Sequence, residues 1–265
     1  MVKKMRAWLL VGLAVLVAPL VVKAADEQAG QQARVLEKQI TVRLNYLLFL
    51  PEGYSAAGEK KWPLMLFLHG AGERGSDINK VKAHGPPKIV EKRKDFPFIV
   101  ISPQCPANSW WRPYELAALL DEIEGKYNVD KDRIYLTGLS MGGYGTWDLV
   151  SQYPQRFAAI APICGGGNPA QARRLKDVPI WVFHGDADRV VPVALSDGMV
   201  EALKKAGADV KYTRYEGIDH DSWTKTYANE ELYQWMLSHK RGEKKATAAA
   251  ATPAPTTPAP AGGGK

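Results

Sequence analysis

Short apolar runs alternate with amphipathic stretches through the middle of this chain. Residues 63–68 form a continuous apolar run, as a strand buried on both faces of a sheet requires. Similar runs follow at residues 98–101, 133–136, 157–163 and 179–183, and a further strand is expected at 210–215. Apolar residues at helical spacing mark residues 115–127, 194–206 and 232–239. Strand–helix alternation requires right-handed crossovers, so the pattern predicts a mainly parallel central sheet with helices on both faces.

The residues that follow the apolar runs are the candidates for function. Residues 39–50 fit one or two antiparallel strands at the edge of the sheet, which would make residues 63–68 the third strand. In open sheets of this kind, ligands bind beyond the carboxyl ends of the strands. Functional side chains are therefore expected directly after the apolar runs.

A glycine-flanked serine follows the run at residues 133–136. The sequence reads Gly138-Leu139-Ser140-Met141-Gly142, and an amphipathic stretch comes next. G-x-S-x-G between a strand and a helix is typical of a nucleophile elbow, a strained turn that presents a serine hydroxyl at a helix N-terminus. The glycines are needed because neighbouring side chains would collide in that turn. The spacing predicts Ser140 as a catalytic nucleophile.

Such a serine needs an imidazole base and an acid, in the chain order serine, acid, histidine. Of the five histidines, only His220 and His239 come late enough. His239 falls on the apolar face of the last predicted helix, whereas His220 lies in a polar loop and is the expected base. The loop after residues 179–183 offers two acids, Asp186 and Asp188, and spacing alone does not separate them.

A second glycine-rich turn follows residues 63–68. Gly70, Gly72 and Gly75 have the spacing of a dinucleotide-binding fingerprint, but no apolar helix begins at Gly75. In a hydrolase, a His-Gly turn at this place supplies a backbone N–H to the oxyanion of the tetrahedral intermediate. The N–H groups of Ala71 and Met141 are therefore the predicted oxyanion hole.

Blocks of this sequence resemble those of the secreted single-domain α/β-hydrolases related to prolyl oligopeptidases, often labelled predicted peptidases or carboxylesterases. The blocks are LPEGY from Leu50, HGAGERG from His69, SPQCP from Ser102, TGLSMGGYGTW from Thr137, APICGG from Ala161, HGDADRVVP from His184 and HDSW from His220. The resemblance covers residues 46–239 and implies the α/β-hydrolase fold with a Ser-Asp-His triad. In relatives the acid is the aspartate two residues before the Val-Val of the sixth block. This implies Asp188 rather than Asp186.

The ends of the chain differ from its middle. Residues 1–24 predict a cleaved signal peptide, with a basic start, an apolar run and small residues before the cut, so a secreted or periplasmic location is expected. The apolar run is too short for stable membrane insertion. Residues 241–265 are rich in Ala, Thr, Pro and Gly and predict a disordered tail, with a spacer or envelope tether as its functional interpretation. Residues 25–240 remain as the predicted catalytic domain.

Charge and cysteine content exclude several other classes. The formal net charge is +7, but the excess lies before residue 25 and after residue 240, so the middle is neutral and no nucleic-acid partner is expected. Two cysteines exclude a four-cysteine zinc site, and the acidic pair after residue 183 lacks the remaining ligands of an EF-hand. No metal or organic cofactor is expected. Cys105 and Cys164 each follow a different strand, and a disulfide between them stays open.

A serine hydrolase acting on small acyl or aryl esters, phenolic esters included, is the function that these features favour. Trp110, Trp111 and Trp223 follow strands or the predicted base, and their indole rings are expected to line an open cleft. No acidic residue is evidently placed to hold the amino group of a peptide. A serine peptidase on short peptides and a non-catalytic envelope binding protein are the alternatives.

Overall fold

The computed structural model describes residues 31–243, in two compact units that divide after Ile40. In the first unit, residues 31–40 form no helix or strand and all are exposed. The predicted signal peptide and residues 244–265 lie outside the described residues. Among residues 31–243, no helix combines the length and the apolar character that crossing a bilayer requires.

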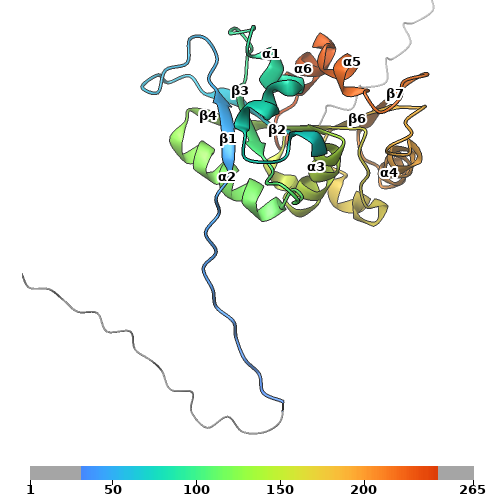
Figure 1. The fold of residues 1–265 in the computed structure, drawn as a ribbon, viewed down its shortest axis with the longest axis horizontal. Helices are drawn as coiled ribbons and strands as arrows, with labels where there is room; N and C mark the ends of the chain where they lie inside the picture. The colour runs from blue at the N-terminus through green and yellow to red at the C-terminus, as the bar shows by residue number, and fades with distance from the viewer. Residues whose placement is uncertain (1–30, 244–265) are drawn as a thin grey trace, which may run out of the picture. The chain divides into compact units, whose positions relative to one another are not determined.

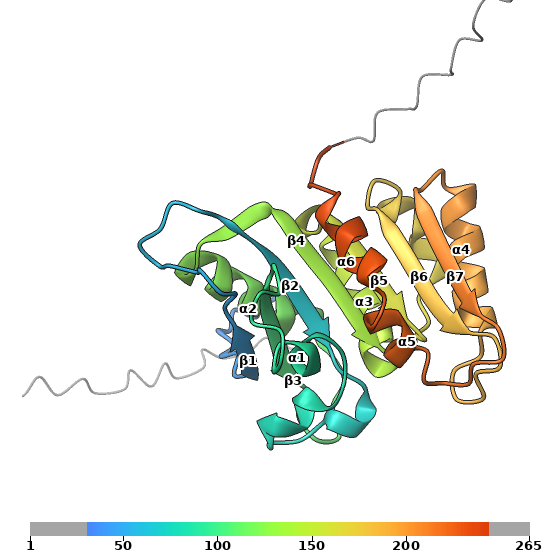
Figure 2. The ribbon, with the colours of Figure 1, turned by 90° about the horizontal axis from the view of Figure 1, so that it is seen from above.

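The second unit is built around one sheet, in which the described residues contribute seven strands in the order β1-β3-β2-β4-β5-β6-β7. Their bounds are β1 Asn45–Phe49, β2 Trp62–Leu68, β3 Ile99–Gln104, β4 Val129–Leu139, β5 Ala159–Ile163, β6 Ile180–Gly185 and β7 Val210–Tyr215. Strand β1 pairs antiparallel with β3, and all other pairs are parallel. Figure 2 shows β2, β4, β5 and β6 running in the same direction. The predicted mainly parallel sheet is confirmed, with one strand rather than two ahead of β2.

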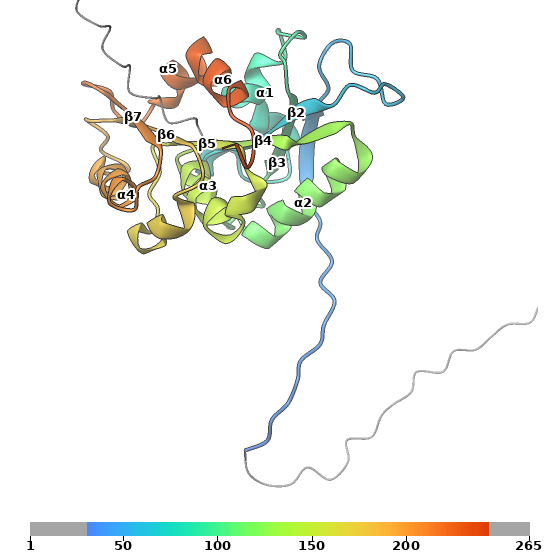
Figure 3. The same ribbon diagram turned by 180° about the vertical axis from the view of Figure 1, so that it is seen from behind.

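Helices cover both faces of the sheet (Figures 1 and 3). Their bounds are α1 Gly85–Ile89, α2 Pro113–Lys126, α3 Met141–Gln152, α4 Ala194–Lys205, α5 Trp223–Tyr227 and α6 Glu230–Leu237. Helices α2, α3 and α4 lie on one face, and α1, α5 and α6 lie on the other. Alternate residues of β2 enter different cores: Leu64 and Leu66 pack on the α2–α4 side, and Met65 and Phe67 on the opposite side. This is why the run at residues 63–68 has no polar position.

The compact unit differs from the predicted boundaries at both ends. It begins at Thr41 rather than at residue 25. At the other end, the backbone N–H of Arg241 donates to the Asp132 carbonyl oxygen over 2.8 Å, and its Nη2 donates to the Asp132 carboxylate over 2.9 Å. Ordered contacts therefore continue past residue 240, the expected end of the domain.

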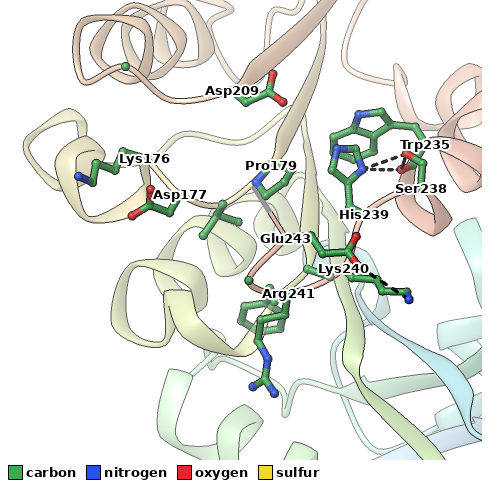
Figure 4. Close-up of a pocket in the computed structure, with 15 residues that line it drawn as sticks. Lys176, Asp177, Pro179, Asp209, Trp235, Ser238, His239, Lys240, Arg241 and Glu243 are labelled. Carbon is green, nitrogen blue, oxygen red and sulfur yellow. Dashed lines mark hydrogen bonds and ion pairs between the residues drawn. The ribbon is translucent and has the colours of Figure 1, made fainter. Parts of the chain in front are cut away.

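A cavity of about 930 Å³ lies at the amino ends of β5, β6 and β7 (Figure 4). Its lining comes from the segments that precede these strands, from the end of α6 and from the residues after α6. Trp235 and His239 face each other there, with ring centroids 4.8 Å apart. Because the strands are parallel, the cavity lies at their amino ends, whereas the candidate functional residues follow their carboxyl ends.

The two cysteines are free and buried. Cys105 follows β3 and Cys164 follows β5, and strands β2 and β4 lie between them. Three strand spacings amount to about 14 Å, roughly twice the reach of a disulfide.

Close packing of helix α3 on the sheet predicts which glycine the fold cannot lose. A Cβ on Gly142 would overlap the carbonyl oxygen of Leu68, whereas a Cβ on Gly198 of α4 meets nothing within 4 Å. We expect Gly142→Ala to destabilise the protein by about 3 kcal/mol or more, because backbone cannot move aside as a flexible side chain can. Gly198→Ala should be neutral or stabilising by up to about 1 kcal/mol. Thermal unfolding of both variants checks this, and equal melting temperatures would contradict it.

Candidate active site

Ser140 stands in a strained turn between β4 and α3. Its φ of 53° and ψ of −117° lie in a region that side-chain-bearing residues rarely adopt. The turn is held because the backbone N–H of Ser140 donates to the Ile163 carbonyl oxygen over 3.0 Å. A Cβ on Gly138 would lie 2.6 Å from the backbone carbonyl carbon of Gly142. The two flanking glycines are therefore required by the close approach of the strand to the helix.

The structure brings the three sequence-predicted residues into one hydrogen-bonded chain. His220 Nε2 lies 2.9 Å from Ser140 Oγ, and His220 Nδ1 lies 2.8 Å from Asp188 Oδ2. They come from three loops, after β4, β6 and β7, which meet at the carboxyl edge of the sheet. Because an ionised carboxylate can only accept, Nδ1 carries the proton and Nε2 is free to accept the serine proton.

Asp188 and Asp186 have different partners. Asp188 is buried, and its Oδ1 accepts from the N–H groups of Val190 and Val191, each over 2.8 Å. Burial alone would raise the pKa of Asp188, but the hydrogen bonds from His220 and from these two amides hold it below its ordinary value. Asp186 is exposed and accepts from the Gly217 N–H over 2.8 Å, and no hydrogen bond joins it to His220 among the described residues.

Three further residues support the hydrogen-bonded chain of Ser140, His220 and Asp188, and this role was not predicted for them from the sequence. Asp219 Oδ1 accepts from the His220 N–H over 2.8 Å, and its Oδ2 accepts from Arg189 Nε over 2.7 Å. This pair ties the loop of Asp188 to the loop of His220. Beneath them, fully buried His184 donates from Nε2 to the Val191 carbonyl oxygen over 2.9 Å, and the same nitrogen lies 3.2 Å from Asp188 Oδ2. Their positions beside Asp188 and His220 in the sequence were the available signal.

The His69-Gly70-Ala71 turn lies against Ser140. A Cβ on Gly70 would stand 3.7 Å from the Ser140 Cβ. Ala71 begins the 3-10 helix η1 (Ala71–Glu73) and Met141 begins α3, so neither N–H has an intrahelical acceptor. His69 fixes the turn from below, because its Nε2 accepts from the Cys105 N–H over 3.0 Å while its Nδ1 donates to the Gly70 carbonyl oxygen over 2.6 Å. Burial lowers the pKa of His69 to about 4.

The three predicted tryptophans have different surroundings. Trp110 is 59% exposed, and its ring centroid lies 6.1 Å from that of Tyr144, one helical turn after Ser140. Trp223 packs edge-on against His220, with ring centroids 5.2 Å apart. The expectation that Trp111 lines the cleft is wrong. Trp111 is only 6% exposed, donates to the His69 carbonyl oxygen over 3.2 Å and fills the space above Gly145.

An apolar strip continues from Trp110 across Tyr144 to Leu195. Tyr144 Cε1 and Leu195 Cδ1 lie 2.9 and 3.1 Å from the point where a Cβ of Gly166 would stand, so they adjoin over that glycine. Leu195 is one of the exposed large apolar residues of the second unit. The strip is joined to the nucleophile at Tyr144, whose backbone N–H donates to the Ser140 carbonyl oxygen over 3.1 Å.

Glu73 lies near the serine and was not among the predicted site residues. Its Oε2 lies 3.3 Å from the same Gly70 Cβ position that the Ser140 Cβ approaches.

One group of metal-ligating atoms coincides with the hydrogen-bonded chain. A ligand atom each of Cys164, Asp188 and His220 lies within 4.8 Å of the others. Burial raises the pKa of the Cys164 thiol to about 12, so the thiol stays protonated, and the other two residues bind each other. This arrangement suits proton transfer better than metal binding.

Comparison with known proteins finds esterases that are similar to this chain in sequence and fold. The model of the Phospholipase/Carboxylesterase family matches residues 114–231. A solved thermostable esterase is 39% identical, with a TM-score of 0.66, over 75% of this chain and 60% of that one. This chain has the α/β-hydrolase fold and is similar to carboxylesterases.

Curated relatives of this α/β-hydrolase carry ester-related names. A bifunctional acetylxylan esterase/xylanase of Neocallimastix patriciarum is 30% identical over 125 residues, which are 45% of this chain and 17% of the relative. A poly(3-hydroxyoctanoate) depolymerase of Pseudomonas fluorescens is 25% identical over 252 residues, or 82% and 87% of the two chains. The chain thus spans about a sixth of the first relative's length. The relationship to prolyl oligopeptidases stays a prediction.

The different partners of the two aspartates predict different variant phenotypes. Asp188→Asn should lower kcat on a butyrate ester by about a thousandfold or more, because an amide can no longer hold the imidazole in the required tautomer. Asp186→Asn should stay near the wild type, since its carboxylate faces Gly217. Steady-state kinetics of both variants decide, and an inactive Asp186 variant would reassign the acid.

The lowered pKa of His69 predicts a pH dependence of stability. The folded protein keeps this imidazole neutral down to pH about 4, whereas an exposed histidine takes up a proton near 6.5. The unfolded state therefore binds more protons between these values, and stability is lost as the pH falls from 6.5 towards 4, by on the order of 3 kcal/mol. The melting temperature of His69→Gln should fall less steeply over this range than that of the wild type. Parallel curves would show that His69 is not the titrating group.

Proposed function

We propose that this protein hydrolyses carboxylic esters through a Ser140-His220-Asp188 triad and an acyl-enzyme. The observation that carries the proposal is the unbroken hydrogen-bonded chain from Asp188 through His220 to the strained Ser140. Each member has the protonation that the reaction needs: a carboxylate held ionised, an Nδ1–H directed at it, and an Nε2 facing the hydroxyl.

In the first step, His220 Nε2 takes the proton of Ser140 while Oγ attacks the acyl carbon. Asp188 stabilises the imidazolium that forms. His220 then gives the proton to the departing alkoxide, the C–O bond breaks and the acyl group remains on Oγ. Water activated by the same imidazole releases the acid in a second round.

The oxyanion of each tetrahedral intermediate is assigned to the N–H groups of Ala71 and Met141. Both are first N–H groups of helical turns, and the Gly70 turn adjoins Ser140. Each such donor contributes about 3 kcal/mol to transition-state stabilisation.

The strip of Trp110, Tyr144 and Leu195 supports small acyl or aryl groups as one half of the ester. Tyr144 stands one helical turn after the nucleophile, and Trp110 and Leu195 extend its aromatic surface with aromatic and aliphatic groups. Trp223, which packs on the base, is assigned to the same binding region. The names of the relatives, an acetylxylan esterase and a polyester depolymerase, agree with ester substrates.

Export is part of the proposal. Residues 1–24 support a secreted or periplasmic protein, and the composition of residues 241–265 supports a spacer or envelope tether.

A substrate panel with matched acyl groups tests the function. We expect hydrolysis of p-nitrophenyl acetate and butyrate, lost by about a thousandfold or more in Ser140→Ala, and weaker or no cleavage of proline and alanine anilides. Circular dichroism of Ser140→Ala provides the folding control. Anilide turnover above that of the esters would favour a peptidase. No turnover of any substrate, together with no labelling of Ser140 by a fluorophosphonate, would favour a non-catalytic binding protein.

A further inference from the structure

Glu73 is held beside the nucleophile by a rigid turn. Gln104 Nε2 donates to the Glu73 carbonyl oxygen over 2.8 Å, and Arg74 Nε donates to the Ala71 carbonyl oxygen over 3.0 Å. These bonds fix the backbone of η1, from which the Glu73 side chain extends. Glu73 Oε2 and the Ser140 Cβ lie 3.3 and 3.7 Å from the point where a Cβ of Gly70 would stand.

This carboxylate lacks the partners that a largely buried charge normally has. Its side chain is only 13% exposed, and Oε2 is buried without a hydrogen-bond partner among the described residues. The nearest imidazole nitrogens are His69 Nδ1 at 3.8 Å and His84 Nε2 at 3.9 Å, both beyond hydrogen-bond distance. His69 Nδ1 donates its hydrogen bond to the Gly70 carbonyl oxygen instead. A buried acceptor without a donor is costly, so a group that donates a hydrogen bond to this carboxylate would be stabilised there.

The contacts of His84 place this carboxylate on the leaving-group side of the site. The His84 ring packs on Trp223 with centroids 5.5 Å apart, and Trp223 packs on His220. His220 gives its proton to the departing alcohol, so the alcohol half of the ester must lie beside this imidazole. Glu73 and His84 are then neighbours of the alcohol and not of the acyl strip.

We propose that Glu73 and His84 form a specificity subsite that binds a hydroxyl group on the alcohol half of the ester, which selects esters of polyhydroxylated alcohols such as sugars or glycerol. The inference rests on the proposed ester hydrolysis and names the substrate class of that site.

A hydroxyl is the group whose chemistry fits the gap. Two atoms 3.9 Å apart can both lie about 2.8 Å from a single oxygen between them. Like Oε2, Glu73 Oε1 accepts no hydrogen bond among the described residues, and Oε1 is the oxygen that faces His84. A hydroxyl at that place can donate to Oε1 and accept from His84 when its imidazole carries the proton on Nε2. An ammonium group only donates, so it would satisfy the carboxylate and oppose the N–H of that tautomer.

Matched butyrate esters test the subsite. Glycerol monobutyrate and propyl butyrate share their acyl group and three-carbon alcohol and differ in hydroxyls, and butyrylcholine offers a cation without a hydroxyl. Acid release by wild type, Glu73→Gln and Glu201→Gln is followed at constant pH. Glu201 is an exposed glutamate of α4 that pairs with Lys205, and it serves as the charge-matched control.

We expect the wild type to prefer the glycerol ester over the propyl ester in kcat/KM, and Glu73→Gln to reduce that ratio about tenfold, because a neutral amide is a weaker acceptor. Glu201→Gln should keep the wild-type ratio. An unchanged ratio in Glu73→Gln, or an equal loss on both esters at an unchanged melting temperature, overturns the subsite. A selective loss on butyrylcholine overturns it in favour of a cation site.

Failure of the proposed function has a different signature. If Ser140→Ala still hydrolyses propyl butyrate, or if the wild type hydrolyses none of the esters, the triad assignment fails and the subsite fails with it. If hydrolysis depends on Ser140 and only the ratio is insensitive to Glu73, the subsite alone is wrong.

Discussion

The left-handed backbone of Ser140 is the constraint on which the rest of the site depends. A residue with a side chain at φ 53° carries strain of about 1–3 kcal/mol, which the surrounding structure must offset. It does so through the parallel strands on either side, since β2 and β5 both pair with β4 next to the turn. Cys164, which follows β5, also has a positive φ of 40°. The sheet thus forces two adjacent loops into unusual conformations, and helix α3 can approach only because Gly142 has no side chain.

The acid and the base depend on that sheet less directly, because they stand on loops. Asp188 is fixed by two backbone amides and by the buried His184, so its position is set by β6 and the loop itself. The loop of His220 is fixed to it by Arg189 and Asp219. An exposed ion pair of this kind adds little to stability. Its contribution is to hold two flexible loops in one register, so that the imidazole meets both the serine and the aspartate.

Patterns along the chain predicted the elements and the strained turn of Ser140 well, because both depend on local spacing. The apolar runs fixed the strands, and G-x-S-x-G between a strand and a helix placed Ser140. Asp186 and Asp188 could not be separated by spacing, since both follow β6. What separates them is which loop amides each one faces, and this is decided by the fold of the loop. Trp110 and Trp111 are adjacent in sequence, yet one is exposed and the other packs on Gly145. Glu73 was missed because nothing local distinguishes it from any other polar turn residue.

The charge of Glu73 has a consequence for catalysis on the proposed role. Negative charge develops on the oxyanion next to the Gly70 turn, and a carboxylate held near that turn opposes it. His69 offers no compensation, because its lowered pKa keeps it neutral at ordinary pH. An ester without a hydroxyl leaves this repulsion in place. When the alcohol half of an ester donates a hydrogen bond to Glu73, the donor partly neutralises the carboxylate charge. The repulsion between this carboxylate and the oxyanion is then weaker. Selectivity at such a site arises from the penalty on the wrong alcohol as much as from the contact with the right one.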